Sequence, residues 1–287
     1  MREEVNILIN IGSYNKLKIL RQADFGYFLY GGTEKTADDI LLPNNNVLDE
    51  KINIDDEIEV FIYRDSKDRP IATLKRPLAK VGDIAYLKVV SNTGIGSFID
   101  FGLEKDILVP QKEKLYGLEN NKYYLFYIYL DKTERIAATT NIDKYLIEND
   151  KYKLNDTVKG IVYGFQTNNS AMVAVDNKYR GVILYNEYFT KLDHGDVLDL
   201  TVNKIYDDGK LGLTPRKTAK TEVSMLQENI LEYLKANNGF MPINDKTSPE
   251  EIYNTFHISK NYFKQALGGL MKKGIITQNE KGTSFKA

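Results

Sequence analysis

The chain has 287 residues, 42% of them apolar and 28% charged, and a formal net charge of −1. It has no cysteine, which excludes disulfides and thiolate metal sites and fits a reducing cytoplasm. The first residues lack the apolar core of a signal peptide, and the longest apolar run, residues 123–130, is far shorter than the ~20 residues of a membrane span. We therefore expect a cytoplasmic protein with no membrane segment.

Charge is unevenly divided along the chain. Residues 1–79 carry 11 Lys and Arg against 14 Asp and Glu, and residues 80–150 carry 9 against 11. Residues 151–219 carry 10 against 8, and residues 220–287 carry 9 against 7. This balance excludes a strongly basic nucleic-acid-binding protein and places the mildly basic part in the C-terminal half.

A pattern of short strands recurs three times before residue 220. Its clearest piece is a closing hairpin whose turn opens with Asp and ends with a base. The three turns are Asp65–Arg69, Asp131–Arg135 and Asp207–Lys210. Five short strands in about 60–75 residues is the size of a small OB-type barrel, so the repeat predicts three of them.

The other predicted strands follow the same order in each copy. The sequence predicts strands at 25–29, 39–43 and 60–63 in the first copy, at 83–91, 95–100, 106–110, 123–130 and 135–139 in the second, and at 157–165, 172–175, 181–184, 197–205 and 210–214 in the third. The first two copies share an Asp-Ile-Leu-x-Pro step at 39–43 and 106–110. This match indicates one repeated unit.

Near Ser224 the apolar period changes from two to about 3.6. A first helix ends before Gly239, a second begins with Pro249 in its first position, and a third is capped by Ser259 and ends at Gly274. A hairpin of residues 275–277 and 283–285 follows. This order predicts a winged helix, and we attribute the pair Gly268–Gly269 to close helix packing.

The candidate nucleic-acid-binding residues are aromatic rings and bases. A ring on the open face of a barrel stacks on any unpaired base, and Lys or Arg meets phosphate. In the barrels the candidates are Phe25, Phe28, Arg69, Lys88, Phe98, Arg135, Lys159 and Lys210. The alternative is that these rings pack in the core and that the hairpin bases only close turns.

In the winged helix, Lys260, Asn261 and Lys264 would point outward from the third helix, with Lys281 in the wing. They would face a groove or a phosphate backbone, although such a domain can also bind protein or serve only as structure. With regard to catalysis, His194 and His257 have no partner at metal-ligand spacing and are interpreted as surface residues. We therefore expect no enzyme activity, no metal and no cofactor.

Phe25-Gly26-Tyr27-Phe28 resembles the second strand of the S1 domain, an RNA-binding OB-type barrel. Ile95-Gly96-Ser97-Phe98 keeps one of the two aromatic rings, and Asn169-Ser170-Ala171-Met172 keeps neither. The His-x-Ser of many S1 domains is absent after the third strand. The fold is thus mainly β, with S1-like barrels at 1–78, 79–149 and 150–218 and a small α+β winged helix at 219–287.

The combination of three S1-like barrels and a winged helix resembles the conserved virulence factor B family, also described as YitL-like proteins. The resemblance implies an RNA-binding post-transcriptional regulator of virulence genes, with single-stranded RNA as a sequence-tolerant partner. A regulator that binds duplex DNA through the winged helix and a protein-docking scaffold with structural barrels remain alternatives. Because aromatic rings gather in the first two copies and positive charge in the later domains, we expect one composite surface. The sequence leaves the oligomeric state open.

Overall fold

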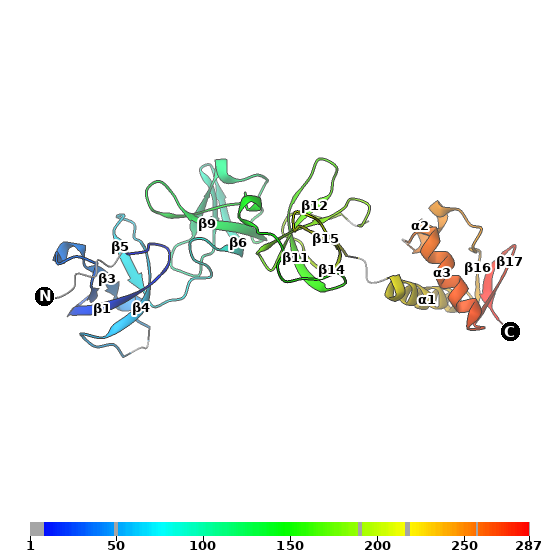
Figure 1. The fold of residues 1–287 in the computed structure, drawn as a ribbon, viewed down its shortest axis with the longest axis horizontal. Coiled ribbons are helices and arrows are strands. Elements are labelled where there is room, and N and C mark those ends of the chain that lie inside the picture. Colours follow the sequence, from blue (N-terminus) through cyan, green and yellow to red (C-terminus); the bar gives the residue numbers. More distant parts are fainter. Residues whose placement is uncertain (1–8, 49–50, 189–190, 216–218, 257, 287) are drawn as a thin grey trace.

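The computed structural model describes residues 9–48, 51–188, 191–215, 219–256 and 258–286, without the side chains of 219–222. Three closed five-stranded barrels follow one another along the long axis of the molecule, and a helical domain lies at the far end (Figure 1). This order confirms the mainly β architecture predicted from the repeat. The secondary-structure elements of each unit fall within the predicted domain ranges, whose boundaries themselves stay predictions.

The three barrels have the same strand order. The first contains β1 (Tyr14–Ala23), β2 (Gly26–Leu29), β3 (Ile40–Pro43), β4 (Glu57–Arg64) and β5 (Pro70–Thr73). The second contains β6 (Ile84–Thr93), β7 (Gly96–Ile99), β8 (Ile107–Pro110), β9 (Tyr123–Leu130) and β10 (Ile136–Thr139). The third contains β11 (Thr157–Phe165), β12 (Ala171–Val175), β13 (Tyr179–Ile183), β14 (Val197–Ile205) and β15 (Leu211–Thr214). In each barrel the last strand lies between the third and the fourth and closes the sheet.

Alternation of apolar residues builds each barrel core. In β1, Leu17 and Ile19 point inward and are buried, whereas the neighbouring Lys16 and Lys18 are exposed. The first strand of every barrel also has a bulge at the same place, between Ile19 and Arg21 in the first barrel. Bulges bend and twist a strand, which helps a small sheet to close.

The glycine of the Phe-Gly and Ile-Gly steps is required by a close approach of two strands. At Gly26 a Cβ atom would lie 2.3 Å from the carbonyl oxygen of Leu42, and at Gly96 it would lie 2.2 Å from that of Val109. Both glycines also have a φ that other residues rarely adopt, +156° and +152°. The resemblance of this segment to S1 domains therefore rests on strand geometry as well as on the rings.

The first two barrels share a core across their junction. Phe61, on the outer side of β4, is fully buried within the apolar cluster of the second barrel. The strand register places Tyr127 at the equivalent position of β9, where it stacks on Tyr145 with ring centroids 3.3 Å apart. The third barrel has Thr201 at this position. A repeated strand position thus carries a ring in the two barrels that are followed by another barrel.

The second and third barrels meet at a junction that includes His194. Its ring stacks on Tyr116 of the second barrel at 3.8 Å and meets Phe165 of the third edge-on at 5.2 Å. Burial lowers the pKa of His194, which keeps the ring neutral at physiological pH. The prediction that His194 is an ordinary surface residue is wrong, because its turn folds back against the neighbouring barrel. His257 lies outside the described residues.

The C-terminal domain is a winged helix with a core of its own. It contains α1 (Ala219–Ala236), β16 (Phe240–Met241), α2 (Pro249–Phe256), α3 (Lys260–Lys272), β17 (Ile276–Asn279) and β18 (Gly282–Phe285). The strands form a sheet in the order β16, β18, β17, against which the helices bury Ile230, Phe263 and Leu267. The sequence does not predict β16, since two residues show no periodicity.

Two local predictions in α3 need correction. Ser259 is the N-cap residue of the helix, but its side chain makes no capping hydrogen bond. Gly269 does permit close packing, because a Cβ there would lie 2.1 Å from the Nε2 of Gln227 in α1. Gly268 does not, since a Cβ at that position would meet nothing within 4 Å.

Candidate nucleic-acid interface

The strand register allows the open faces of the barrels to be compared residue by residue. Phe28 lies opposite Leu41 on β2 and β3, Phe98 lies opposite Leu108 on β7 and β8, and Met172 lies opposite Val182 on β12 and β13. Each of the three follows its barrel's bulge by one pair, so the positions are equivalent. The first two barrels therefore present a phenylalanine at the same point of the same face.

In the first barrel, two predicted rings and a predicted base line one cleft of about 650 Å³. Phe25 is 59% exposed and meets Phe28 edge-on at 5.9 Å. The guanidinium of Arg21 lies 3.7 Å from the centroid of Phe28 and pairs with Asp39 at 2.9 Å. Arg69 also lines this first cleft. The sequence predicts both rings but not Arg21, which the hairpin register pairs with Phe28.

In the second barrel, Phe98 and Arg135 line an equivalent cleft of about 450 Å³. Ile95 replaces the first ring and is 65% exposed. Residues Tyr63–Ser66 of the first barrel contribute to the wall of this second cleft, and Glu134 of the second barrel contributes to the first. The two clefts thus flank the same pair of hairpin turns.

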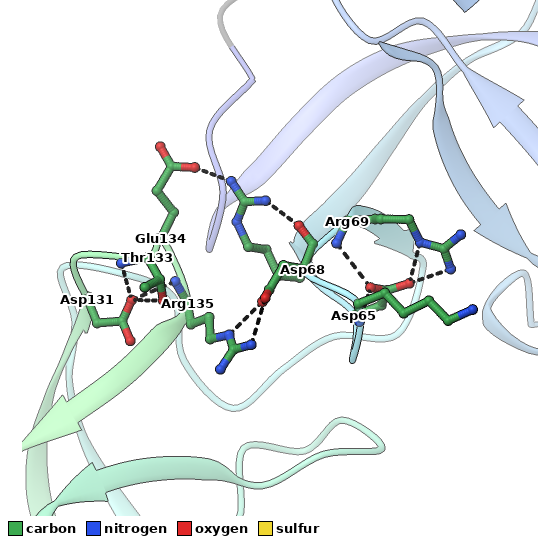
Figure 2. Close-up of polar contacts among 9 residues, drawn as sticks. Asp65, Asp68, Arg69, Asp131, Thr133, Glu134 and Arg135 are labelled. Atoms are coloured by element: carbon green, nitrogen blue, oxygen red, sulfur yellow. Dashed lines mark hydrogen bonds and ion pairs between the residues drawn. The ribbon is translucent and has the colours of Figure 1, made fainter. Parts of the chain in front are cut away.

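Ion pairs connect these turns across the barrel junction (Figure 2). Arg135 donates to both carboxylate oxygens of Asp68, at 2.6 and 2.8 Å, and Arg64 pairs with Glu134. We call these four residues the hairpin contact. The hydrogen bonds from Arg135 hold the pKa of the Asp68 carboxyl below its usual range, so the pair is charged at neutral pH.

Arg69, the other predicted hairpin base, is held within its own turn. Its guanidinium donates to Asp65 at 2.7 and 3.0 Å, and the same carboxylate accepts the backbone N–H of Lys67 and of Arg69 (Figure 2). Partial burial raises the pKa of Asp65, but these hydrogen bonds outweigh it and keep the carboxyl below its ordinary value. Both arginines therefore lie beside a cleft with a carboxylate already bound.

In the third barrel, the equivalent face packs against the second barrel and the segment that connects the two. Met172 and Ala174, on the outer side of β12, pack in a cluster with Leu125 of the second barrel and with Ile142 and Leu146 of the connecting segment. Arg180 of β13 also donates to the carbonyl oxygen of Asp143 in that segment at 2.8 Å. The connection to the second barrel thus occupies the surface that forms a cleft in the first two.

The remaining predicted bases of the barrels lie apart from the two clefts. Lys210 has its Nζ 3.5 Å from a carboxylate oxygen of Asp208. Lys159 is exposed on β11, opposite Asp199. Lys88 lies on β6 opposite Tyr123, on the same side of the strand as Tyr86, whose hydroxyl contacts Gly195 of the third barrel.

In the winged helix, only some of the predicted nucleic-acid-binding residues are exposed for contact with a ligand. Lys260 donates to the carbonyl oxygens of Lys246 and Thr247 at 3.2 and 2.8 Å, which fixes the loop before α2. Asn261, Lys264 and Lys281 are exposed, and within the described residues neither Lys264 nor Lys281 has an ion-pair partner.

No group of three or more His, Asp or Glu side chains among the described residues could hold a metal ion. None of the helices described there is both long and apolar enough to cross a membrane.

Comparisons with known proteins agree with this architecture. The S1 domain model matches residues 11–75 and 81–141, and the model of the CvfB-like winged helix domain matches residues 228–285. A crystal structure of a multidomain protein with nucleic acid binding domains from Streptococcus pneumoniae has a TM-score of 0.51 and 26% identity, covering 96% of this chain and 98% of that one.

Named relatives align over nearly the full length. The chain is 32% identical over 286 residues to the uncharacterized protein YitL of Bacillus subtilis, covering 96% of this chain and 93% of the relative. It is 25% identical over 276 residues to conserved virulence factor B of Staphylococcus epidermidis, covering 93% and 91%. The chain therefore belongs to the family of YitL and conserved virulence factor B, which joins S1 barrels to a winged helix.

Proposed function

We propose that the protein binds single-stranded RNA with little sequence preference and acts in the cytoplasm as a post-transcriptional regulator. The S1 and winged-helix domain types support nucleic-acid binding, and the name of the relatives, conserved virulence factor B, connects the family with virulence. The observation that carries the choice of a single strand is the repeated cleft of the first two barrels. Each holds a phenylalanine at the same register position beside a hairpin arginine.

Unpaired bases expose flat faces that a paired duplex does not. A ring in a cleft can stack on such a base, which is worth about 1–3 kcal/mol per base regardless of its identity. Arg69 and Arg135 line the two clefts and would meet the adjoining phosphates, but each must first exchange its carboxylate for a phosphate oxygen. Binding should therefore be modest at each cleft and should gain from the linkage of the two.

The test replaces the equivalent rings in the full chain, as Phe28→Ala and Phe98→Ala. Titration of a labelled oligouridine by fluorescence anisotropy at low salt should show affinity at least about fivefold weaker for each variant, because one stacked base is lost. Tyr185→Ala is the matched control, since Tyr185 is 64% exposed and lines neither cleft. Unchanged affinity in both phenylalanine variants would favour the protein-docking scaffold.

A second candidate function, duplex binding by the winged helix, is supported by the exposed side chains of Asn261 and Lys264 on α3. It predicts that the full chain binds duplex DNA more tightly than single-stranded RNA. It also predicts that Lys264→Ala weakens duplex binding while RNA binding stays the same. The opposite order of affinities would leave RNA as the ligand.

A further inference from the structure

A third cleft lies between the second and third barrels. It has a volume of about 760 Å³, within the range of small-ligand sites. Its walls come from the start of β6, from Tyr123 of β9, from Tyr145 of the connecting segment and from Asp176–Lys178 in the turn between β12 and β13. We call it the junction cleft. It lies on the first and fourth strands of the second barrel, whereas the second cleft lies on the other strands.

Tyrosine rings form one wall of the junction cleft. Tyr123 is 48% exposed, and its ring centroid lies 5.5 Å from that of Tyr86. Tyr86 is fixed in place, since its hydroxyl donates to the carbonyl oxygen of Gly195 in the third barrel at 2.7 Å. A large ring left half open beside a fixed neighbour offers a flat surface for a nucleobase at little cost in side-chain entropy.

The charged groups of the junction cleft favour an anion. Its two acids are already paired, Asp83 with Lys80 at 2.7 Å and Asp176 with Lys151 at 2.7 Å. Lys178 has no carboxylate ion-pair partner among the residues the structure describes, and its Nζ donates to the hydroxyl of Tyr179 at 3.0 Å. That hydroxyl in turn donates to Asp150 at 2.6 Å. Unlike Arg69 and Arg135, Lys178 can therefore meet a phosphate without displacing a carboxylate.

A tight turn and strand pairing place one lysine in the wall of the cleft and a second beside its exposed ring. Asp176 and Asn177 both adopt a left-handed conformation, with φ of 53°, and this tight turn of the third barrel presents Lys178 to the cleft. On the second barrel, Lys88 lies directly opposite Tyr123 in the β6 and β9 ladder. Cross-strand neighbours have Cβ atoms about 4.5–5.5 Å apart, so a ring and a second cation lie together.

We propose that the junction cleft is an additional single-stranded RNA site, in which a nucleobase stacks on Tyr123 and an adjoining phosphate meets Lys178 and Lys88. The inference rests on the proposed RNA-binding function and deepens it. The site requires both barrels, because the ring comes from one and Lys178 from the other. It also gives Lys88 a role that the two equivalent clefts do not.

The experiment measures binding of labelled oligouridine to the full chain by anisotropy at several salt concentrations. Tyr123→Ala should weaken binding about fivefold or more, whereas Tyr123→Phe should bind like the wild type, since stacking needs the ring and not the hydroxyl. Lys178→Ala should weaken binding and reduce the slope of log K against log salt by about one. Tyr185→Ala, an exposed tyrosine outside the cleft, should change nothing.

Wild-type binding with unaltered affinity in both Tyr123→Ala and Lys178→Ala would overturn the junction site and leave the proposed function standing. No binding by the wild type at ~50 mM salt would instead reject the proposed function itself. If Tyr123→Ala fails to fold, as judged by thermal unfolding, Lys178→Ala decides, because its side chain lies in an exposed turn. An unchanged salt slope in that variant rejects the site.

Discussion

Asp68 combines a turn conformation with an ion pair between barrels. Its backbone is left-handed, with φ of 62°, and the equivalent residues of the other hairpins, Glu134 and Gly209, have φ of 58° and 69°. A glycine would fit this position best, yet the first two barrels carry an acid there. Both acids form the hairpin contact, so the conformational cost is offset by the pairs with Arg135 and Arg64.

We predict that Asp68→Asn increases RNA affinity. The variant keeps a residue that tolerates the left-handed conformation, but it removes the charge that occupies Arg135. Because exposed ion pairs are weak, we expect binding about two- to fivefold tighter and a salt slope steeper by about one. Anisotropy titrations of oligouridine at several salt concentrations would measure both.

The matched control is Asp55→Asn. Asp55 is also left-handed, with φ of 74°, and also forms an exposed ion pair, with Lys18 at 2.7 Å, but Lys18, unlike Arg135, lines none of the clefts. The two variants change the net charge equally. If Asp68→Asn bound RNA no more tightly than Asp55→Asn, the carboxylate would not compete with phosphate.

For single residues, the sequence predicts which side chains line the clefts better than it predicts which groups those side chains bind. The repeat predicts Phe28, Phe98 and the hairpin bases as candidates, and in the structure Phe28 lines one cleft with Arg69 and Phe98 another with Arg135. The carboxylates bound to Arg69 and Arg135 could not be assigned, since one lies in the same turn and the other in a different barrel. Which carboxylate each arginine binds depends on the relative orientation of the two barrels, which the sequence does not give.

Among the elements, α3 contains two glycines with different surroundings. Gly269 packs on Gln227, whose side chain donates to the carbonyl oxygen of Ala266 at 3.4 Å and accepts from Lys273 at 2.8 Å. Gly268 faces open space in an ordinary helical conformation. A glycine within a helix costs about 1 kcal/mol relative to alanine. Packing accounts for that cost at Gly269 and not at Gly268.

We therefore predict opposite effects for the two alanine variants. Gly268→Ala should stabilise the winged helix by about 0.5–1 kcal/mol, because only the unfolded chain loses freedom. Gly269→Ala should destabilise it by about 1 kcal/mol, since Gln227 must leave its hydrogen bonds. Thermal unfolding followed by circular dichroism at 222 nm would measure this, as the α-helices described all lie in this domain. Equal shifts of the two variants would contradict the packing account.

Elements were predictable where the period was long. The strands Thr157–Phe165 and Val197–Ile205 and the helix Pro249–Phe256 match their predicted ranges. Each has several turns or alternations, or a proline that fixes its start. Most other strands differ by one or two residues, but β4 begins three residues before its predicted start, and β1, β5 and β16 had no predicted range, so a long period alone was not sufficient. Neighbouring strands, which the sequence alone does not reveal, decide where such elements begin and end.

For the whole molecule, the junctions decide what each barrel exposes. The third barrel has the same strand order as the others, but its open face packs on Leu125, Ile142 and Leu146. Met172 in place of a phenylalanine indicated the loss of a stacking ring. It did not indicate that the face is covered, because burial between domains leaves no period in the sequence. The tyrosines of β9 were likewise predicted only as a strand.

His194 makes the junction of the second and third barrels sensitive to pH. Burial between Tyr116 and Phe165 lowers the pKa of its imidazole below the ordinary 6.5, and the nearby Asp193 only partly opposes this. The folded state thus prefers the neutral ring. Its contribution to stability is complete above about pH 6.5 and is lost as the pH falls through the lowered pKa.

We predict that His194→Phe removes this pH-dependent contribution to stability. Phenylalanine keeps the stacking on Tyr116 but cannot bind a proton, so the fall in Tm between pH 7.5 and pH 5 should be smaller than in the wild type. Differential scanning calorimetry of the barrels at the two pH values measures the difference, and the winged helix, whose core is separate, serves as the internal reference. A cation stacked on a tyrosine ring could instead be favourable. An equal or larger fall in the variant would mean that the protonated ring is accepted at the junction, and the second and third barrels would then stay joined in acid.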